Sequence, residues 1–216
     1  MSRRYAGRFI TFEGGEGVGK STNIRFCADW LMAQGQEVLV TREPGGTPIA
    51  ELIRSRLLKA NHAESMDPLA ELLLMFAARA QHVSRVIRPA LTEGVWVLCD
   101  RFTDSTIAYQ GFGRGLDLAL IDHLRVMTHG DLTPDCTFLL DAPVEIGMAR
   151  ARGRSAVSGE ETDRFEREQQ AFFERVREGF QTLAATHAHF VTLDAAAELE
   201  LVQRHLQEHL ERLLRG

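Results

Sequence analysis

A glycine-rich loop near the amino terminus carries the residues with the most recognisable chemistry. Gly14, Gly19, Lys20 and Ser21 fit the pattern GxxxxGK(S/T), and the loop lies between a predicted strand and a predicted helix, the context in which this pattern binds phosphate. The glycines allow consecutive N–H groups to face one anion, and the helix that begins near Lys20 adds the positive end of its dipole. Lys20 can reach the β- and γ-phosphates of a nucleoside triphosphate, and Ser21 can ligate Mg²⁺. The residues predicted to bind the nucleotide are Gly14, Gly15, Glu16, Gly17, Val18, Gly19, Lys20, Ser21 and Thr22.

A second pair of chemically informative residues follows an apolar run in the middle of the chain. The run at residues 95–99 ends in Asp100, and Arg101 comes next. Ligands bind where the carboxyl ends of parallel strands meet, so Asp100 can lie near Mg²⁺ and the Arg101 guanidinium can bind a phosphate. Asp100 could instead cap a helix or a turn, as acids at strand ends often do. We predict catalytic roles for Lys20, Asp100 and Arg101, with Ser21 and Asp100 as the Mg²⁺ ligands.

Alternating strands and helices must position these side chains. Apolar or β-branched runs predict five strands, at residues 9–12, 38–41, 95–99, 137–140 and 190–193. Helices are expected at residues 24–35, 47–59, 67–91, 106–110, 117–128, 144–150, 163–185 and 199–214, with a kink or an end near Pro89. The expected N-caps include Thr47 and Asp67, each followed by proline, and Asp163 with Glu166. The alternation predicts an α/β fold, a doubly wound parallel sheet in one domain of residues 1–216, with the polar stretch 152–162 as a mobile flap.

The composition is that of an ordinary globular chain. Of its 216 residues, 44% are apolar and 25% are charged, enough for a sizeable core in one domain. The formal charge of −5, from 25 basic and 30 acidic residues, argues against a broad nucleic-acid-binding surface. Cys27, Cys99 and Cys136 form no CxxC pair, so neither a zinc site nor a disulfide framework is indicated. The first ten residues lack a signal-peptide core, and no apolar run approaches the roughly 20 residues of a membrane span. We expect a cytoplasmic protein with neither a membrane nor a nucleic-acid polymer as partner.

Four further segments give the chain a family resemblance when they are taken together with the glycine-rich loop. They are TREPGG at residues 41–46, DRF at 100–102, AYQG at 108–111 and DRFE at 163–166. With GGEGVGKST, these segments resemble bacterial thymidylate kinase at matching positions from about residue 8 to about residue 180. The resemblance implies a P-loop nucleoside monophosphate kinase fold with a short lid at about residues 150–163. It also implies ATP and Mg²⁺ as cofactors, in-line phosphoryl transfer to dTMP to give dTDP, and a homodimer.

The resemblance further implies which residues hold the acceptor nucleotide. Arg42 and Arg101 would bind its phosphate, and two planar guanidinium groups suit a phosphate oxygen that must be held in line for attack. Pro44 would follow a cis peptide bond and pack on the base, while Glu16 would contact the 3′-hydroxyl of the deoxyribose. Tyr109 would crowd the sugar 2′ position and disfavour ribonucleotides. The alternative interpretations are an ordinary turn proline, a solvated glutamate and a partly buried tyrosine.

The same resemblance places the base site on the helix expected at residues 67–91. Arg79 fits the family arginine that bonds a base carbonyl. The family has an aromatic ring one turn earlier, but here Met75 lies four positions before Arg79 and Phe76 lies three before. Either residue could cover the base, because both lie on the helix face of Arg79. Thr106 and Gln110 complete the set of expected substrate-binding residues.

Thymidylate kinases differ in where they keep a catalytic arginine, either in the phosphate loop or in the lid. The variable loop positions 15–18 contain no basic residue, whereas Arg150, Arg152 and Arg154 precede the polar stretch. The chain therefore resembles the lid-arginine type. Arg152 and Arg154 are the catalytic candidates, and Arg150, nearest the predicted helix, is expected to be partly structural. The alternative is a solvated run of charges.

Two other functions compete with the phosphorylation of dTMP. A P-loop kinase of another small acceptor or nucleoside monophosphate would keep the loop but would leave TREPGG and AYQG unexplained. A non-catalytic P-loop nucleotide switch would bind a protein partner, but the sequence contains no NKxD-type guanine reader. Turnover measured with a panel of nucleoside monophosphates separates these possibilities.

Overall fold

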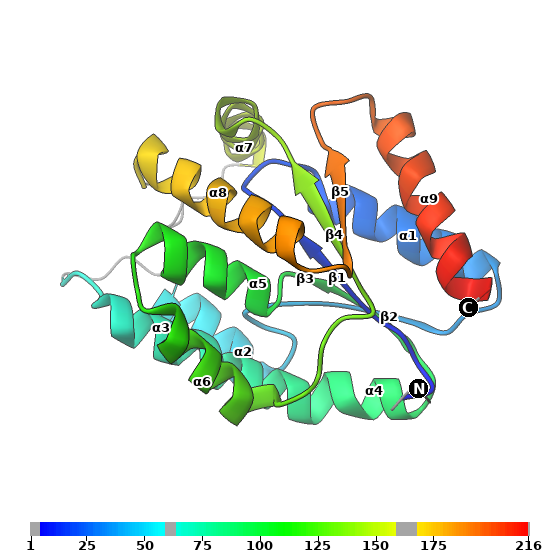
Figure 1. Cartoon of the computed structure of the whole chain (residues 1–216), viewed down its shortest axis with the longest axis horizontal. Helices are drawn as coiled ribbons and strands as arrows, with labels where there is room; N and C mark the ends of the chain where they lie inside the picture. Colours follow the sequence, from blue (N-terminus) through cyan, green and yellow to red (C-terminus); the bar gives the residue numbers. More distant parts are fainter. Residues whose placement is uncertain (1–4, 59–63, 159–167, 216) are drawn as a thin grey trace.

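Five parallel strands form the central sheet of the computed structural model, which describes residues 5–58, 64–158 and 168–215 (Figure 1). The strands are β1 (Phe9–Glu13), β2 (Val38–Arg42), β3 (Trp96–Asp100), β4 (Cys136–Asp141) and β5 (Phe190–Asp194). They lie in the order β2-β3-β1-β4-β5, and every neighbouring pair is parallel. Because β1 lies between β3 and β4, the loops after these three strands meet at one edge of the sheet. The expected doubly wound parallel sheet is confirmed.

Helices connect the strands. They are α1 (Lys20–Ala33), α2 (Pro48–Leu52), α3 (Pro68–His82), α4 (Arg88–Thr92), α5 (Thr103–Thr106), α6 (Leu118–His129), α7 (Val144–Ser158), α8 (Gln170–Thr186) and α9 (Leu199–Arg215). Three π-helical segments continue some of them, namely η1 (Ile53–Leu58), η2 (Val83–Ile87) and η3 (Ile107–Gly113). Among the described helices, none has both the length and the apolar character needed to cross a membrane.

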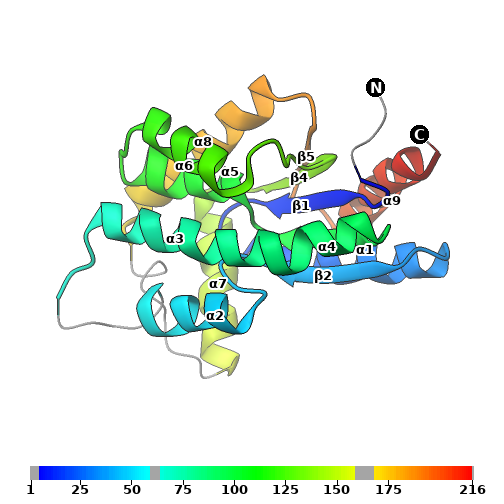
Figure 2. The same cartoon turned by 90° about the horizontal axis from the view of Figure 1, so that it is seen from below.

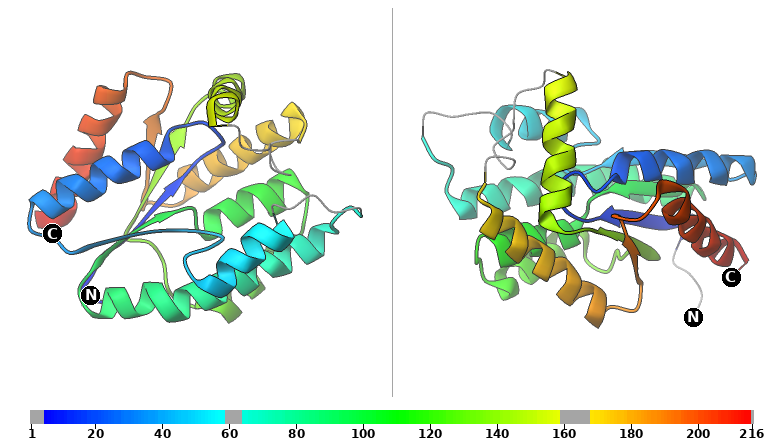
Figure 3. Two further views of the ribbon diagram at one scale, coloured as in Figure 1. Left: turned by 180° about the vertical axis from the view of Figure 1, so that it is seen from behind. Right: turned by 90° about the horizontal axis from the view of Figure 1, so that it is seen from above.

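The helices cover both faces of the sheet (Figure 3). On one face, α1 and α9 pack on the strands, and Ile24, Leu31, Leu206 and Leu210 are at most 3% exposed there. On the other face, η2 and α4 pack against β1 and β3, while η3 and α8 pack against β4. Fully burying one leucine side chain stabilises a fold by about 1.5–3 kcal/mol. These clusters therefore fix the strands, and with them the loops at their carboxyl ends.

Two helix starts follow the capping signals in the sequence. Thr47 Oγ1 accepts a hydrogen bond from the N–H of Ala50 at 3.1 Å, and a carboxylate oxygen of Asp67 accepts one from the N–H of Leu69 at 2.8 Å. Each cap precedes a proline in the first turn, where a missing N–H costs nothing. Both predicted N-caps are confirmed.

Pro89 lies within a helix that continues from α3 through η2 into α4. The backbone of this helix widens to a π-helical turn over η2, just before the proline. Pro89 has no N–H to donate, and its ring crowds the carbonyl of Arg85 four residues earlier. The expected kink or end therefore takes the form of a wider turn, which accommodates the ring without ending the helix.

One helix boundary predicted near the expected flap was wrong, and the residues of another lie outside the described ranges. Helix α7 continues to Ser158 instead of ending at Arg150, because residues 151–158 contain no proline and include several good helix formers. Helix α8 begins at Gln170, and the expected capping pair, Asp163 with Glu166, lies outside the described residues. Residues 159–163 of the expected lid lie outside them as well.

Candidate active site

The phosphate loop joins β1 to α1. Gly14, Gly17 and Gly19 have φ angles of +132°, +70° and +88°, which residues with a Cβ rarely adopt. Helix α1 begins at Lys20, so its positive N-terminal end faces the loop. Lys20 Nζ donates to the carbonyl oxygens of Gly14 and Gly15 at 3.1 and 2.7 Å. Burial lowers the pKa of Lys20 to about 8. The loop therefore holds a buried cation at the N-terminal end of α1.

Arg101 ties the phosphate loop to the segment after β3. Its backbone is left-handed, with φ of +69°, which is uncommon for a residue with a Cβ. Nη1 donates to Gly14 O at 3.0 Å and to Ser105 Oγ at 3.1 Å, while Nη2 donates to Glu16 Oε1 at 2.6 Å and to Tyr109 Oη at 3.1 Å. The guanidinium carbon also lies 4.9 Å from the centre of the Tyr109 ring. These contacts fix a second cation against the phosphate loop.

Asp100 offers a carboxylate at the same edge of the sheet. Its Oδ1 is buried and has no hydrogen-bond partner among the described residues. An unpaired buried acceptor is costly, and Mg²⁺ prefers oxygen ligands. Ser21, in the first turn of α1, is exposed. The described residues contain no group of three or more His, Cys, Asp or Glu side chains that could hold a metal. Ser21 and Asp100 offer oxygens of the kind that Mg²⁺ binds together with substrate phosphates.

The end of β2 and the helix that follows it add two more arginines, Arg42 as the last residue of β2 and Arg54 in η1. Arg42 Nη2 donates to both carboxylate oxygens of Glu51 at 3.0 Å. The Glu43–Pro44 peptide bond is cis, as the resemblance implied. Arg54 Nη1 donates to Pro44 O at 2.9 Å, and burial together with the charge of Arg42 lowers the pKa of Arg54. Two guanidinium groups therefore share one region, an arrangement that suits an anionic ligand.

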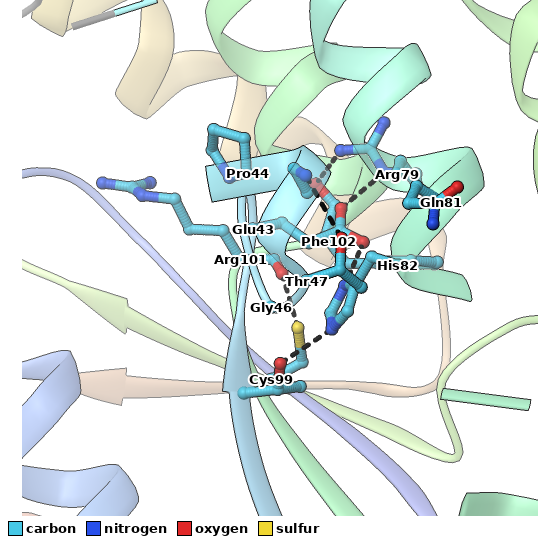
Figure 4. A network of polar contacts seen from close by, with 12 residues as sticks. Glu43, Pro44, Gly46, Thr47, Arg79, Gln81, His82, Cys99, Arg101 and Phe102 are labelled. Carbon is cyan, nitrogen blue, oxygen red and sulfur yellow. Dashed lines mark hydrogen bonds and ion pairs between the residues drawn. The ribbon is translucent and has the colours of Figure 1, made fainter. Parts of the chain in front are cut away.

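Arg79 lies in a buried polar network beside this loop (Figure 4). Its Nε donates to Glu43 Oε2 at 2.6 Å, and its Nη2 donates to Phe102 O at 3.1 Å and to Thr106 Oγ1 at 3.0 Å. The rings of Phe76 and Phe102 have their centres 4.9 and 5.4 Å from the guanidinium carbon. Nη1 is buried and meets no acceptor in the part of the chain that the structure describes. A ligand acceptor can therefore satisfy it.

Comparison with known proteins places these features in one family. A model of the thymidylate kinase family matches residues 12–206. The chain belongs to the thymidylate kinase family. It is 57% identical to the thymidylate kinase of Chromohalobacter salexigens over 209 residues, which cover 96% of this chain and 97% of that protein. It is 55% identical to a thymidylate kinase of Pseudomonas fluorescens, with the same coverage of 96% and 97%. The crystal structure of thymidylate kinase from Ehrlichia chaffeensis is 34% identical, with a TM-score of 0.74 over 94% of this chain and 98% of that one.

Membership of the thymidylate kinase family confirms the P-loop kinase fold and the enzyme class expected from the sequence. Around the phosphate loop, the structure brings together four of the predicted residues, Glu16, Lys20, Arg101 and Tyr109. The Tyr109 hydroxyl donates to Glu16 Oε1 at 2.9 Å. Burial raises the pKa of Tyr109 well above its ordinary value, so this hydroxyl keeps its proton.

The residues expected at the thymidylate kinase base site have different surroundings. Phe76 is 3% exposed and packs in a core cluster with Leu72, whereas Met75 is only partly buried. Gln110 is 1% exposed, and its Nε2 donates to Glu71 Oε1 at 2.7 Å. A substrate that uses the Gln110 amide therefore has to share it with Glu71 or displace that bond.

Sequence reasoning missed Glu13, the last residue of β1. It is fully buried, and it accepts hydrogen bonds from Phe102 N at 2.7 Å and from Ser105 Oγ at 2.5 Å. Ser105 is also a partner of Arg101, so Glu13 fixes the turn that carries the arginine. Burial, followed by the charge of Asp104, raises the pKa of Glu13 from 4.5 to about 8. The available signal was an acid that ends a buried strand immediately before the phosphate loop.

Glu43 and Arg54 were missed as well. Glu43 lies inside the TREPGG segment, so the motif itself was the signal. Arg54 lies on the helix predicted after that segment, where the sequence does not distinguish a ligand-facing arginine from a solvated one.

The structure describes the expected lid arginines only in part. Arg150 Nη1 donates to the carbonyl oxygen of Ala195 at 2.6 Å, the structural contact that was expected of it. Arg152 is exposed on α7, and the side chain of Arg154 lies outside the description. Both residues belong to α7, which continues to Ser158.

Proposed function

We propose that the chain carries out the reaction of its family, the ATP-dependent phosphorylation of dTMP to dTDP, by direct in-line transfer between two adjoining phosphate sites. The observation that carries this proposal is the hydrogen bond of 3.0 Å from Arg101 Nη1 to Gly14 O. It holds an arginine of the acceptor site against the loop for the donor phosphates. No side chain acts as nucleophile, because a phosphate oxygen of dTMP attacks and the protein contributes positioning and charge neutralisation.

The donor phosphates of ATP would lie on the amides of residues 14–22. Lys20 would exchange its bonds to the loop carbonyls for the β- and γ-phosphates. Ser21 and Asp100 would hold Mg²⁺, which would supply positive charge to neutralise the donor phosphates. The buried, unpaired Oδ1 of Asp100 supports this assignment.

The acceptor phosphate would be held by Arg42 and Arg101, with Arg54 beside them. Arg42 pairs with Glu51, and Arg101 pairs with Glu16. A phosphate dianion competes with these carboxylates for the same N–H groups and forms stronger, charge-assisted bonds when both arginines bind it. The phosphate is thereby held with one oxygen free to attack.

The base would be read by Arg79. Its buried Nη1 would donate to a thymine carbonyl, and cytosine would present an amino donor at that position instead. The remaining residues proposed to line the base are Pro44, Met75 or Phe76, Thr106 and Gln110.

The sugar would lie against the pair formed by Glu16 and Tyr109. Glu16 would accept a hydrogen bond from the 3′-hydroxyl, and the Tyr109 ring would occupy the space that a 2′-hydroxyl requires. The hydrogen bond between Tyr109 and Glu16 supports a shared sugar site.

The transferring phosphoryl group would be neutralised from the lid. Arg152 and Arg154 are the proposed cations, in a lid at about residues 150–163, because the phosphate loop offers no arginine. Arg150 is proposed to be partly structural, because its Nη1 donates to the carbonyl oxygen of Ala195.

ADP release, measured with ATP and each of dTMP, dUMP, dCMP, dGMP, AMP and UMP, tests the function. The expected preference for dTMP over dUMP is about 10- to 200-fold, the range for one methyl group in an apolar pocket. Discrimination against dCMP should be larger, because Arg79 would face a donor. A higher kcat/KM for another acceptor would make that acceptor the substrate, and slow hydrolysis without any acceptor would favour a nucleotide switch.

We also propose a homodimer, formed through the helices α2, α3 and α6, which lie side by side (Figure 2). Each of the three exposes large apolar side chains, among them Leu52, Leu73 and Met127. Met127 is 82% exposed, and exposed apolar side chains gathered on adjoining helices are typical of a protein–protein interface. Sedimentation of the native chain and of Met127→Glu tests this, and a native monomer would contradict it.

We propose the cytoplasm as the site of action. Cys27, Cys99 and Cys136 are all buried and free, as expected of a protein that works in a reducing compartment. Fractionation of cells tests this, and recovery outside the cytoplasmic fraction would contradict it.

A further inference from the structure

Glu43 lies at the centre of a buried network that connects the loop after β2 to α3 (Figure 4). Its side chain is 3% exposed. One carboxylate oxygen, Oε2, accepts from Arg79 Nε at 2.6 Å, and the other, Oε1, accepts from His82 Nδ1 at 3.0 Å. Burial alone would raise the pKa of Glu43, but Arg79 and His82 hold it below its ordinary value. Both bonds are therefore made to an ionised carboxylate.

His82 connects this carboxylate to the end of β2. Its side chain is fully buried, three residues after Arg79 and hence on the same face of α3. A carboxylate only accepts hydrogen bonds, so Nδ1 must carry a proton. Nε2 lies 2.7 Å from Thr41 Oγ1, which donates to it when the imidazole is neutral. His82 therefore spans from Glu43 to Thr41.

The segment at residues 41–46, which is the end of β2 and the loop after it, lies directly over the imidazole. Gly46 has φ of +81°, and a Cβ there would collide with His82 Cδ2 and Nε2 and with Thr41 Oγ1. The network thus holds the position of the loop that carries Arg42 as well as the position of Arg79.

Arg79 has little freedom left once these contacts are made. Nε is held by Glu43, Nη2 is held by Phe102 O and Thr106, and the rings of Phe76 and Phe102 lie close to the guanidinium. Nη1 is then the nitrogen whose direction the network sets, and it has no protein acceptor within the described ranges. Removing the bond at Nε would allow the planar group to turn and move Nη1.

We propose that Glu43 and His82 are positioning residues for base recognition, which aim Nη1 of Arg79 at the base and couple its direction to the 41–46 loop. This inference rests on the proposed function, in which Arg79 reads a base carbonyl. It adds two specificity-determining residues that do not themselves touch the nucleotide.

Two substitutions of His82 test the proposal with matched chemistry. His82→Asn keeps an amide nitrogen on Cγ, the atom to which Nδ1 is bonded, and can still donate to Glu43. His82→Gln places its amide near the position of Nε2 and loses that bond. Glu43→Gln removes the charge at nearly constant volume and provides a second route if a His82 variant fails to fold. For each variant, kcat and KM are measured with dTMP and dCMP, and Tm is measured as a control for folding.

We expect His82→Gln and Glu43→Gln to raise KM for dTMP on the order of 10-fold and to reduce the dTMP-to-dCMP ratio of kcat/KM by a similar factor, about the effect of losing one hydrogen bond to a charged group. The value of kcat should change less, because the base contact is the same in the ground and transition states. His82→Asn should retain most of the native ratio. The control is Asp135→Asn, which weakens an ion pair with Arg8 at the opposite edge of the sheet and should lower Tm without changing the ratio.

Arg79→Met distinguishes base reading by Arg79 from the positioning role of Glu43 and His82. If Arg79→Met leaves the dTMP-to-dCMP ratio unchanged, base reading by Arg79 fails, and the proposed function loses that part. If Arg79→Met lowers the ratio while His82→Gln and Glu43→Gln retain it, the positioning proposal is overturned and base reading stands. A drop in Tm with a native ratio overturns the positioning proposal too, since it shows a purely structural role.

Discussion

Gly17 of the phosphate loop and Gly147 of α7 meet backbone against backbone. A Cβ on Gly17 would collide with the carbonyl of Gly147, and a Cβ on Gly147 would collide with the carbonyl oxygen of Glu16. The helix that carries the expected lid arginines is therefore seated directly on the loop proposed to hold ATP. Movement of α7 toward the loop at this point must displace the loop, because the two backbones are already close-packed.

Gly147→Ala should lower both stability and ATP binding. Overpacking at a close contact costs about 1–3 kcal/mol, so we expect a lower Tm and a raised KM for ATP. Gly153→Ala on the same helix is the matched control, since a Cβ there would meet no described atom within 4 Å. Any effect of Gly153→Ala on the free energy of unfolding should be an increase of about 0.5–1 kcal/mol, because alanine favours a helix over glycine. Native Tm and KM in Gly147→Ala would mean that α7 and the loop move apart freely.

The pH dependence of kcat/KM for ATP should have a basic limb near pH 8. The pKa of Lys20 is lowered from 10.5 to about 8, so in the free enzyme the ammonium is charged below that pH and neutral above it. Only the charged form binds phosphate well, and kcat/KM should fall about tenfold per pH unit above the limb. Bound phosphates favour the charged form, so the limb in kcat should lie at higher pH.

Glu13 must be separated from Lys20 in that experiment, because burial also raises the pKa of Glu13 to about 8. The substitution Glu13→Gln removes the carboxyl group that titrates at this position. A limb that persists in Glu13→Gln belongs to Lys20, and a limb that disappears belongs to Glu13 and contradicts the prediction.

Tyr109 should select the sugar by its ring and not by its hydroxyl. Tyr109→Phe loses the bonds to Glu16 and Arg101 and should lower kcat/KM for dUMP and UMP by a similar factor, which leaves their ratio near the native value. Tyr109→Ala should raise kcat/KM for UMP relative to kcat/KM for dUMP. Steady-state kinetics with this base-matched pair decides the matter, and an unchanged ratio in Tyr109→Ala would make Tyr109 a packing residue only.

Arg152 and Arg154 should act on the transition state. Their loss should lower kcat more than it raises KM, because the charge they neutralise develops during transfer. Arginines in this role contribute on the order of 10³–10⁵ in rate, and sharing between two would make each single Met substitution milder than the double one. Arg150→Met is the control and should affect Tm more than kcat, since its contact is with Ala195. An unchanged kcat in the double variant with both substrates and Mg²⁺ saturating would exclude the lid mechanism.

The sequence by itself determined the strands, the phosphate loop and the first helix caps. Each of these depends on residues that are close along the chain. The runs that form β1 to β5 consist mainly of apolar and β-branched residues, the loop motif spans Gly14 to Ser21, and Thr47 and Asp67 cap helices that begin at the next residue. Local signals of this kind can also mislead. The polar composition after Arg150 indicated a flap, but α7 continues there as a helix.

The tertiary structure alone decided how the site is held. Glu13 meets Ser105 across 92 positions, Arg79 meets Glu43 across 36, and Arg101 meets Glu16 across 85. No local pattern specifies such partners, because the strand order β2-β3-β1-β4-β5 brings these distant segments to one edge of the sheet. Burial then gives the contacts their effect: away from water, an unpaired carboxylate or guanidinium nitrogen is costly, so each must find a partner in the fold or in a ligand.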